Sequence, residues 1–301
     1  MKTKLIIITG MIAMQFCNAQ TFTDKINKEI LFEKKSNENA LMVANIDGDV
    51  KVTGYVGDKV MVEVTRTITA KTIERLEQGK TELQMGFIDR ADTLIFFVEG
   101  GCNQFGKNTH RKNNGDWGSR GGWGYEWNNN GRGRGCIPPY DYKLDFAIKV
   151  PFTVNLILST INDGDVKVEN TKGALKVENV NGSIKLSKIS REATATTVNG
   201  DVDIEYVTNP LKDCRFYSLN GDINAWFQKG LAANMSFESF NGDLFTNVDR
   251  LESLPVMVEK EQRTNGIKYK VKDNRFKIGN GGVFLDFETF NGDVYLKEKV
   301  N

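Results

Sequence analysis

Apolar and polar residues alternate with a regular period along the second half of the chain. From Gly164 the sequence divides into nine-residue units whose third, fifth and eighth residues are mostly apolar. Because the side chains of a strand alternate between its two faces, the third and fifth residues point to the same side. We therefore expect each unit to be one short strand with a buried face, followed by a corner. The units are GDVKVENTK, GALKVENVN, GSIKLSKIS, REATATTVN and GDVDIEYVT.

A turn tripeptide, Asn-Gly-Asp or a close variant, returns at the corners at steps of 18, 18, 21, 21 and 50 residues. Asn and Gly both tolerate the positive φ angles of tight turns. Two units make an 18-residue rung, and the 50-residue step leaves room for two rungs and an excursion with a hairpin around Asn265-Gly266. The copies are Asp163-Gly164-Asp165, Asn181-Gly182-Ser183, Asn199-Gly200-Asp201, Asn220-Gly221-Asp222, Asn241-Gly242-Asp243 and Asn291-Gly292-Asp293.

These repeats predict a mainly β protein built as a right-handed parallel β-helix, a β-solenoid, over residues 137–301. Independent Asn-Gly hairpins are the alternative. An outlying copy of the turn, Asp47-Gly48-Asp49, lies in residues 20–100. There we expect a small α+β portion that caps the solenoid, with strands at 59–69 and 93–98 and one helix over 72–85. The rung edge after Leu296 has no evident cap, which predicts end-to-end self-association.

Residues 1–19 have the pattern of a removable signal peptide. Lys2 and Lys4 precede a short apolar run, and Cys17-Asn18-Ala19 forms a small-residue exit. A lipoprotein in which Cys17 carries the lipid is the alternative. No later run is long enough to span a bilayer. We expect an exported protein of the periplasm or the cell surface, or a secreted one, without a transmembrane segment after signal removal.

Export into an oxidising compartment changes how the cysteines are interpreted. Cys102 and Cys136 bracket residues 101–136, a segment of distinct composition, so they are the expected disulfide pair. Cys214 is left over. It is expected to be a small buried residue, with an intermolecular bridge as the alternative.

The chain resembles the bacterial putative-adhesin β-helix family. The resemblance is carried by the signal, the early turn copy, the helical stretch and the serial rungs ending in ETFNGDVYL. This family is a domain of unknown function similar to head GIN and auto-transporter adhesin domains. The resemblance covers most of residues 38–300 apart from 101–136. It implies a β-helix fold and a cell-envelope setting, and it carries over no catalytic residues.

Residues 101–136 form a loop insertion rich in Gly, Trp and Arg. They hold three of the four tryptophans and the one histidine, His110. In an extended conformation Trp123, Tyr125 and Trp127 point to one side. Such rings can stack on sugar rings, and arginines pair with anionic groups. A flexible, solubilising loop is the alternative. The candidate ligand-binding residues are Trp117, Trp123, Tyr125, Trp127, Arg111, Arg120, Arg132 and Arg134.

The formal net charge of +1 is a cancellation. The signal carries +2, the loop insertion +4 and the remainder −5. A nucleic-acid partner is therefore not expected. The turn aspartates should stack in one column of like charges. We expect their carboxylates to accept turn N–H groups beside Lys167 and Lys185, with weak cation binding as the alternative.

No cofactor, catalytic residue or metal site is predicted. A His-based triad or metal centre would have to be built around His110, and no Ser/His/Asp set or catalytic metal spacing appears elsewhere. We expect a non-catalytic, adhesin-like protein that binds or scaffolds at the envelope. Its partner would be an anionic glycan, the envelope surface or a protein. A polysaccharide-acting enzyme using paired acids such as Asp201 and Asp203 is the runner-up. A role in envelope-stress signalling is a third alternative, which only the family resemblance suggests.

Overall fold

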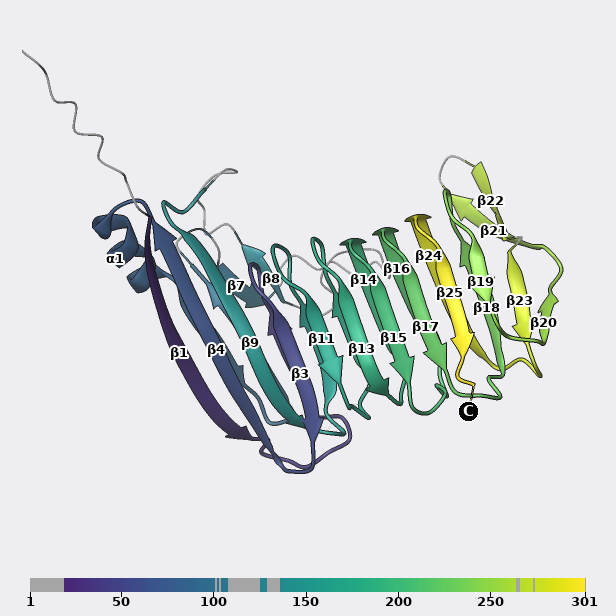
Figure 1. The fold of residues 1–301 in the computed structure, drawn as a ribbon, viewed down its shortest axis with the longest axis horizontal. Coiled ribbons are helices and arrows are strands. Elements are labelled where there is room, and N and C mark those ends of the chain that lie inside the picture. Colours follow the sequence, from purple (N-terminus) through teal and green to yellow (C-terminus); the bar gives the residue numbers. More distant parts are fainter. Residues whose placement is uncertain are drawn as a thin grey trace, which may run out of the picture.

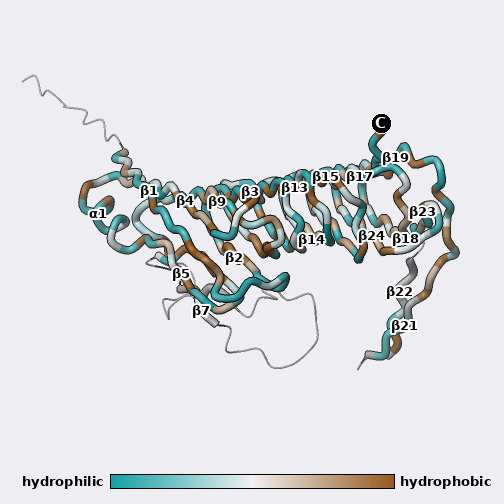
Figure 2. The backbone as a smooth tube through the Cα atoms, turned by 90° about the horizontal axis from the view of Figure 1, so that it is seen from below, coloured by the Kyte–Doolittle hydropathy of each residue, from teal (hydrophilic) through white to brown (hydrophobic). Residues whose placement is uncertain are grey.

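A computed structural model describes residues 19–100, 102, 104–107, 125–128, 136–263, 266–272 and 274–300. The body is an elongated rod of two sheets that share one apolar core (Figures 1 and 2). Sheet A contains, in spatial order, β1 (Gln20–Leu31), β4 (Lys59–Ala70), β9 (Asp141–Pro151), β3 (Val50–Tyr55), β11 (Val166–Glu169), β13 (Ile184–Ile189), β15 (Val202–Tyr206), β17 (Ile223–Phe227), β25 (Val294–Glu298) and β19 (Leu244–Thr246).

Sheet B lies behind sheet A in Figure 1. In spatial order it contains β20 (Leu251–Ser253), β23 (Arg275–Ile278), β18 (Ala233–Glu238), β24 (Val283–Asn291), β16 (Cys214–Asn220), β14 (Ala193–Asn199), β12 (Leu175–Glu178), β10 (Asn155–Ser159), β2 (Ala40–Ala44), β6 (Thr93–Glu99) and β5 (Gln84–Asp89).

The nine-residue units form rungs with one strand in each sheet, so the hairpin alternative is wrong. Val166 pairs in parallel with Ile184, and Leu175 with Ala193, each 18 residues further on. The third and fifth positions of the units are buried, as the alternation predicts. The eighth position is not uniform, because Val180 and Val207 lie at corners and are exposed.

Both ends of the rod contain antiparallel pairs, so a purely parallel coil is too narrow a prediction. At the N-terminal end β4 pairs antiparallel with β1 and β9, and β5 with β6. At the other end β23 pairs antiparallel with β18 and β20. The outlying turn copy at Asp47 is part of the stack, since β3 pairs in parallel with β9 and β11.

The rungs of the C-terminal part do not stack in chain order. β24 lies between β16 and β18, and β25 lies between β17 and β19. The expected open edge after Leu296 is therefore wrong, because β25 is paired on both sides and Leu296 is fully buried. The predicted hairpin is confirmed as β21 (Met257–Arg263) and β22 (Gly266–Lys272), which project from the rod in Figure 2. The 50-residue step holds one rung, not two.

The predicted helix is α1 (Ile73–Glu82), which lies at the N-terminal end of the rod in both views. Thr72 caps it, because its side-chain oxygen accepts the backbone N–H of Arg75 at 3.3 Å. Leu83 after the helix is fully buried, and Ile73 at its start is exposed. Within the described part of the chain, no helix has the length and apolar character needed to cross a bilayer. The signal and Cys17 lie outside that part, apart from Ala19.

Candidate recognition surfaces

The turn aspartates form a ladder of hydrogen bonds along the rod. Each side chain accepts the backbone N–H of the equivalent residue on the next rung, at 2.8 to 3.2 Å. This confirms that the carboxylates accept turn N–H groups, although the donor belongs to the neighbouring rung and not to the same turn. The ladder starts where Asp145 accepts from Asp49, and its further members are Asp165, Ser183, Asp201, Asp222, Asp293 and Asp243.

A second ladder runs beside the first through the amides of the turn asparagines. The side-chain N–H of Asn199 donates to the side-chain oxygen of Asn181 at 2.8 Å, and Asn220 donates to Asn199 at 2.9 Å. Asn291 donates to Asn220 and Asn241 donates to Asn291, each at 2.8 Å. The turn motif is therefore structural, since its polar groups are used in stacking the rungs.

The turn glycines have no room for a side chain. A Cβ on Gly200, whose φ is +150°, would lie 2.4 Å from the carbonyl oxygen of Gly182. Buried hydroxyls complete this corner, because Thr197 donates to the Gly182 carbonyl at 2.8 Å and Ser218 to the Gly200 carbonyl at 2.9 Å. A Cβ on Gly221, Gly242 or Gly292 would lie even closer to the carbonyl oxygen of the glycine on a neighbouring rung.

Lysines neutralise the first part of the aspartate column. Lys51 lies 3.4 Å from Asp49 and Lys167 lies 3.0 Å from Asp165. Although burial raises the pKa of Asp49, the Asp165 backbone N–H and the Lys51 ammonium outweigh it and hold the pKa of Asp49 below its ordinary value. Among the residues placed by the structure, no three His, Cys, Asp or Glu side chains converge as they would around a metal ion.

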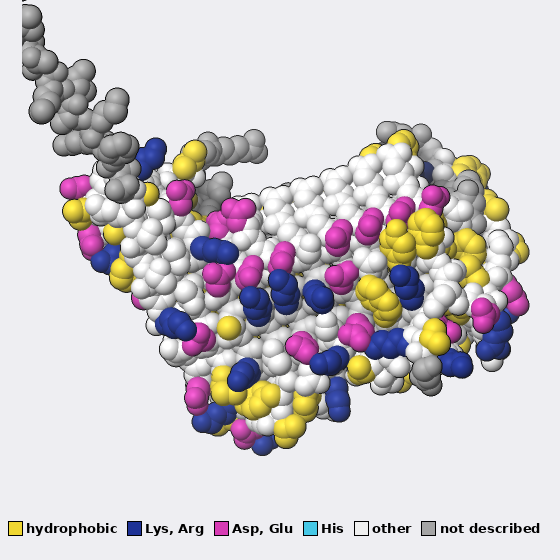
Figure 3. All heavy atoms as spheres, viewed as in Figure 1, with side chains coloured by type: hydrophobic (Ala, Val, Ile, Leu, Met, Phe, Trp, Pro, Cys, Tyr) yellow, Lys and Arg dark blue, Asp and Glu magenta, His cyan; other side chains and the backbone are white. Residues whose placement is uncertain are grey.

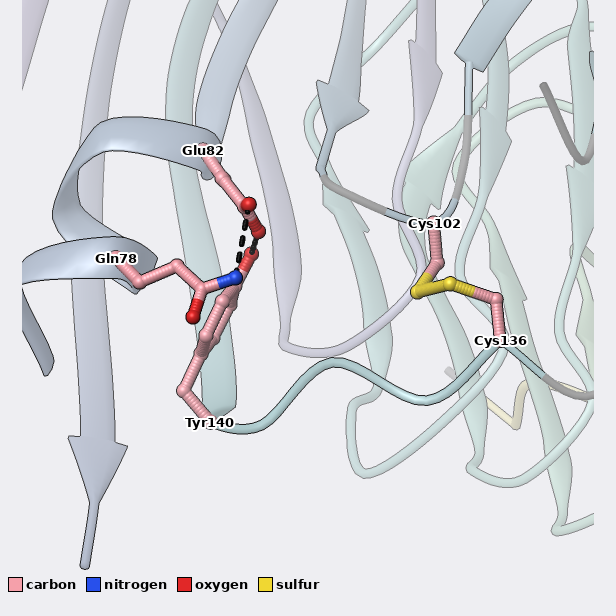
Figure 4. The surroundings of a disulfide bond; sticks show 5 residues. All are labelled: Gln78, Glu82, Cys102, Cys136 and Tyr140. Carbon is pink, nitrogen blue, oxygen red and sulfur yellow. Dashed lines mark hydrogen bonds between the residues drawn. A yellow bond between two sulfur atoms is a disulfide. The ribbon is translucent and has the colours of Figure 1, made fainter. Parts of the chain in front are cut away.

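The base of the 101–136 insertion, called here the outgrowth, is closed by the predicted disulfide. Cys102 and Cys136 are bonded, which closes a loop with a sequence separation of 34 residues. Figure 4 shows this bond beside the chain that leads into Tyr140. In the chain-entropy model, a closed loop of this length stabilises the folded state by about 3 to 4 kcal/mol.

A ring stack holds the base against sheet B, and a hydrogen bond fixes the chain that follows it. Phe105 of β7 (Gln104–Lys107) is buried and stacks on Phe97 of β6, with ring centroids 4.6 Å apart. Met42, Ala44 and Ile95 surround these rings on the outer side of sheet B. On the other flank, buried Tyr140 donates to the Glu82 carboxylate of α1 at 3.1 Å (Figure 4).

Beyond β7, the structure describes one further strand of the outgrowth. β8 (Tyr125–Asn128) pairs antiparallel with β7, which places the backbone of Trp127 opposite Phe105. The side chains of Tyr125 and Trp127 are not described. Trp117, Trp123, His110, Arg111, Arg120, Arg132 and Arg134 lie outside the described residues, so their role in binding stays a prediction.

The outer face of sheet A changes character along the rod. Figure 3 shows rows of acidic and basic side chains over β3, β11 and β13, and apolar side chains gathered over β17, β25 and β19. Cross-strand register explains the change, because Lys51, Lys167 and Lys185 occupy the position that Tyr295 and Phe245 occupy on the last rungs. Tyr295 and Phe245 stack with ring centroids 5.0 Å apart.

A groove of about 270 Å³ lies where the two halves of this face meet. Trp226 of β17 forms one side, and Ser187 lines the groove where β13 bulges between Leu186 and Ile189. The sequence prediction did not include Trp226, because this tryptophan lies in a repeat strand outside the outgrowth. The available signal was a tryptophan at the outward position between inward Ala225 and Phe227. The charged lining residues are Lys185, Asp203, Glu205 and Lys299.

The paired acids of the enzyme alternative already have structural partners. Asp201 accepts the backbone N–H of Asp222 at 2.9 Å, and Asp203 accepts the side-chain amide of Asn224 at 3.0 Å. Neither carboxylate is placed in a deep cleft, since the nearby groove is shallow and open to solvent. These partners explain both acids without a catalytic role.

Cys214 is a buried free thiol, as expected. Its sulfur lies 3.2 Å from the Tyr206 hydroxyl, and burial raises the pKa of the thiol. Tyr206 is itself fully buried and stacks on Phe227 at 5.0 Å between ring centroids. The pair therefore belongs to the core.

Comparison with known proteins agrees with a repeat-built β domain. Residues 153–295 match the family model described as Toastrack DUF4097. A comparison with curated proteins gives no significant match. One similar solved structure is a "putative cell adhesion protein" from Clostridium sporogenes ATCC 15579, at 10% identity and a TM-score of 0.42, covering 92% of this chain and 100% of that one.

A second similar structure is a "putative adhesin" from Bacteroides fragilis NCTC 9343. It shares 11% identity at a TM-score of 0.31, and the alignment covers 92% of this chain and 97% of that one. The family match covers the rungs from the segment before β10 to β25, which is the C-terminal part of the 38–300 region to which the resemblance extends.

Proposed function

We propose that this chain is an exported, non-catalytic recognition protein of the cell envelope, in which a rigid rod presents the outgrowth to a partner. The anchoring of the outgrowth carries the proposal. The Cys102–Cys136 disulfide closes the base, the Phe105–Phe97 stack holds the base against sheet B, and the Tyr140–Glu82 hydrogen bond fixes the chain that follows it. A loop that served only solubility would not need a closed and packed base.

The composition of the outgrowth indicates the chemistry of its partner. Its six basic residues outnumber its two acidic residues, and it carries three tryptophans. Guanidinium groups bind sulfate, phosphate and carboxylate groups in bidentate geometry, and indole rings stack on sugar rings. The proposed partner is therefore an anionic glycan of the envelope, with an anionic protein surface as the alternative.

The rod itself suits presentation, because side-chain ladders tie every rung to the next. The coil is proposed to be right-handed, the hand that crossovers between parallel strands favour. End-to-end self-association of the rod is also proposed, through another strand edge than the one after Leu296. β19, and not β25, is the last strand of sheet A, and its exposed Phe245 and the exposed Phe240 before it would lie in the contact.

A pull-down from envelope extract tests the proposal. The wild-type chain is compared with a chain in which a Gly-Ser linker replaces residues 108–124, which keeps the disulfide and β7. A matched control shortens the other projecting hairpin, β21–β22. The wild type and the control should capture the same partner, and the linker chain should lose it. Equal capture by the linker chain would contradict the proposal.

A further inference from the structure

We propose that the groove beside Trp226 is a second binding site, which takes a neutral oligosaccharide on the outer face of sheet A. This site lies on the opposite sheet from the outgrowth, whose base packs on sheet B. The inference does not depend on the outgrowth as a binding element. It is carried by the shape, the ring and the hydrogen-bonding groups of the groove.

The groove has the size and the floor of a site for one sugar ring. Its volume of about 270 Å³ lies just below the range of about 300 to 1,000 Å³ of drug-sized pockets. The floor is rigid, because β13 pairs with β15 on both sides of the bulge and β15 pairs in register with β17. A rigid floor lowers the entropy cost of holding a ligand.

Trp226 provides the stacking surface. Its side chain stands on the outer face, since its neighbours Ala225 and Phe227 point into the core. The face of an indole ring is electron-rich and attracts the weakly positive C–H groups of a pyranose ring. The ammonium of Lys297 lies over this ring, 5.8 Å from its centroid, and over the ring of Tyr295 at 5.3 Å. A sugar that stacks on Trp226 therefore has to displace this flexible side chain.

The polar groups beside the ring are held in place by one another. The Asn224 amide, next to the groove but outside its lining, donates to one oxygen of Asp203 at 3.0 Å and so orients this carboxylate. The second oxygen of Asp203 is left for a ligand. Lys299 pairs with Glu205 on the other side of the groove. A fixed acceptor next to a fixed donor matches the adjacent hydroxyls of a sugar.

The charges indicate that the ligand is neutral. Two acids, Asp203 and Glu205, and two bases, Lys185 and Lys299, line the groove, so its net charge is zero. Beside it the aspartate column continues through Asp201, Asp222 and Asp293. On the earlier rungs a lysine stands two residues after the turn aspartate or serine. On the rungs beside the groove the same position is Asp203, Asn224 or Tyr295. The lining of the groove therefore offers an anionic sugar chain no net attraction.

Tryptophan fluorescence tests the proposal directly, because three of the four tryptophans lie in the outgrowth. Replacing Trp117, Trp123 and Trp127 by Phe leaves Trp226 as the single tryptophan. Maltohexaose, cellohexaose, laminarihexaose and chitohexaose are titrated as neutral probes, with hexagalacturonate as the anionic probe. We expect a saturable change in emission with at least one neutral probe. No change with any of them, or saturation by hexagalacturonate alone, would overturn the proposal.

Calorimetric titration of the full chain with the responding probe gives the second test. Trp226→Ala should weaken binding about tenfold, a loss of about 1.4 kcal/mol, while Trp226→Phe should recover part of it. Asn224→Ala should weaken binding while leaving the ring in place. Phe290→Ala removes an exposed ring at a corner and should change nothing. An equal loss with Phe290→Ala would contradict a site at the groove.

The same titration separates this proposal from the function of the outgrowth. The linker chain lacking residues 108–124 should bind the neutral probe as the wild type does. If that chain loses only its envelope partner, the two sites are independent. If it loses the neutral probe as well, the groove is not the binding site.

Discussion

The Asp293 carboxylate accepts the backbone N–H of Asp243 at 2.9 Å, although Asp243 precedes it by 50 residues. The same Asp293 donates its own N–H to Asp222, 71 residues earlier. The last rung in the chain is therefore the second-last rung in space. Its aspartate links two rungs that are otherwise not adjacent.

Replacing Asp293 tests this stacking order. Asp293→Ala leaves the Asp243 N–H without its acceptor and should lower the free energy of unfolding by about 1 to 2 kcal/mol. Asp293→Asn keeps an acceptor oxygen and should stay close to wild type. Chemical denaturation measures both. Asp249→Ala, at an exposed position outside the ladder, is the control. Equal stability of all these chains would contradict the ladder.

A methyl group at a turn glycine should disrupt the stack. Gly200→Ala would place a Cβ 2.4 Å from the Gly182 carbonyl oxygen, so the rungs would have to move apart. We expect a loss of about 2 to 4 kcal/mol in unfolding free energy. Gly230→Ala is the matched control, because Gly230 also has a positive φ, of 84°, but no atom lies within 4 Å of its Cβ position. A similar loss at both sites would show that φ strain alone is responsible.

Asp47 occupies the position where most later rungs carry the ladder asparagine. Burial and the nearby Asp163 and Asp141 carboxylates raise the pKa of Asp47 above its ordinary value. A raised pKa means that the folded state binds the proton more tightly, so the charge of Asp47 costs stability at neutral pH. Asp47→Asn should therefore increase the unfolding free energy at pH 7, by no more than about 0.5 kcal/mol, because solvent screens the charge of this half-exposed residue.

The sign of this effect gives its pH dependence. As the pH falls through the raised pKa of folded Asp47 toward about 4, the wild type becomes protonated and the advantage of Asn should vanish. Thermal melts of both chains across this range measure it. An advantage that persists at acid pH would contradict the assignment to the charge of Asp47.

How much was predictable is clearest at the C-terminal rungs. The turn tripeptides identify the rungs, because each needs Gly at the crowded corner. Their order in space is not readable, since the copies at Asn241 and Asn291 have the same pattern. The structure decides it through β23, which pairs antiparallel with β18 on its outer edge. The remaining edge of β18 is then the only one available to β24.

The anchor of the outgrowth left a signal in the sequence that alternation did not explain. Most rung strands alternate, but ALMVA in β2 and TLIFFVE in β6 are continuous apolar runs. Such runs are typical of strands buried on both faces. Met42 and Phe97 point away from the main core and cover Phe105. The groove at Trp226 was not predictable in this way, because it depends on the cross-strand neighbours of one residue.

The cysteines should respond to thiol reagents in a definite pattern. Cys214 is buried and its thiol pKa is raised, while Cys102 and Cys136 are bonded. A chain that begins at Gln20, without Cys17, should therefore show no reactive thiol when native and one thiol when denatured without reductant. A disulfide-linked dimer would instead support an intermolecular role for Cys214. Three thiols after denaturation would contradict the Cys102–Cys136 bond.

Binding to an array of sulfated and uronic glycans tests the central claim most directly. The wild-type chain is compared with Trp123→Ala/Trp127→Ala, while Trp226→Ala is the control on the opposite sheet. The account predicts that anionic glycans retain the wild type and the control and that the double variant loses them. Retention of the double variant at wild-type strength would contradict recognition through the outgrowth.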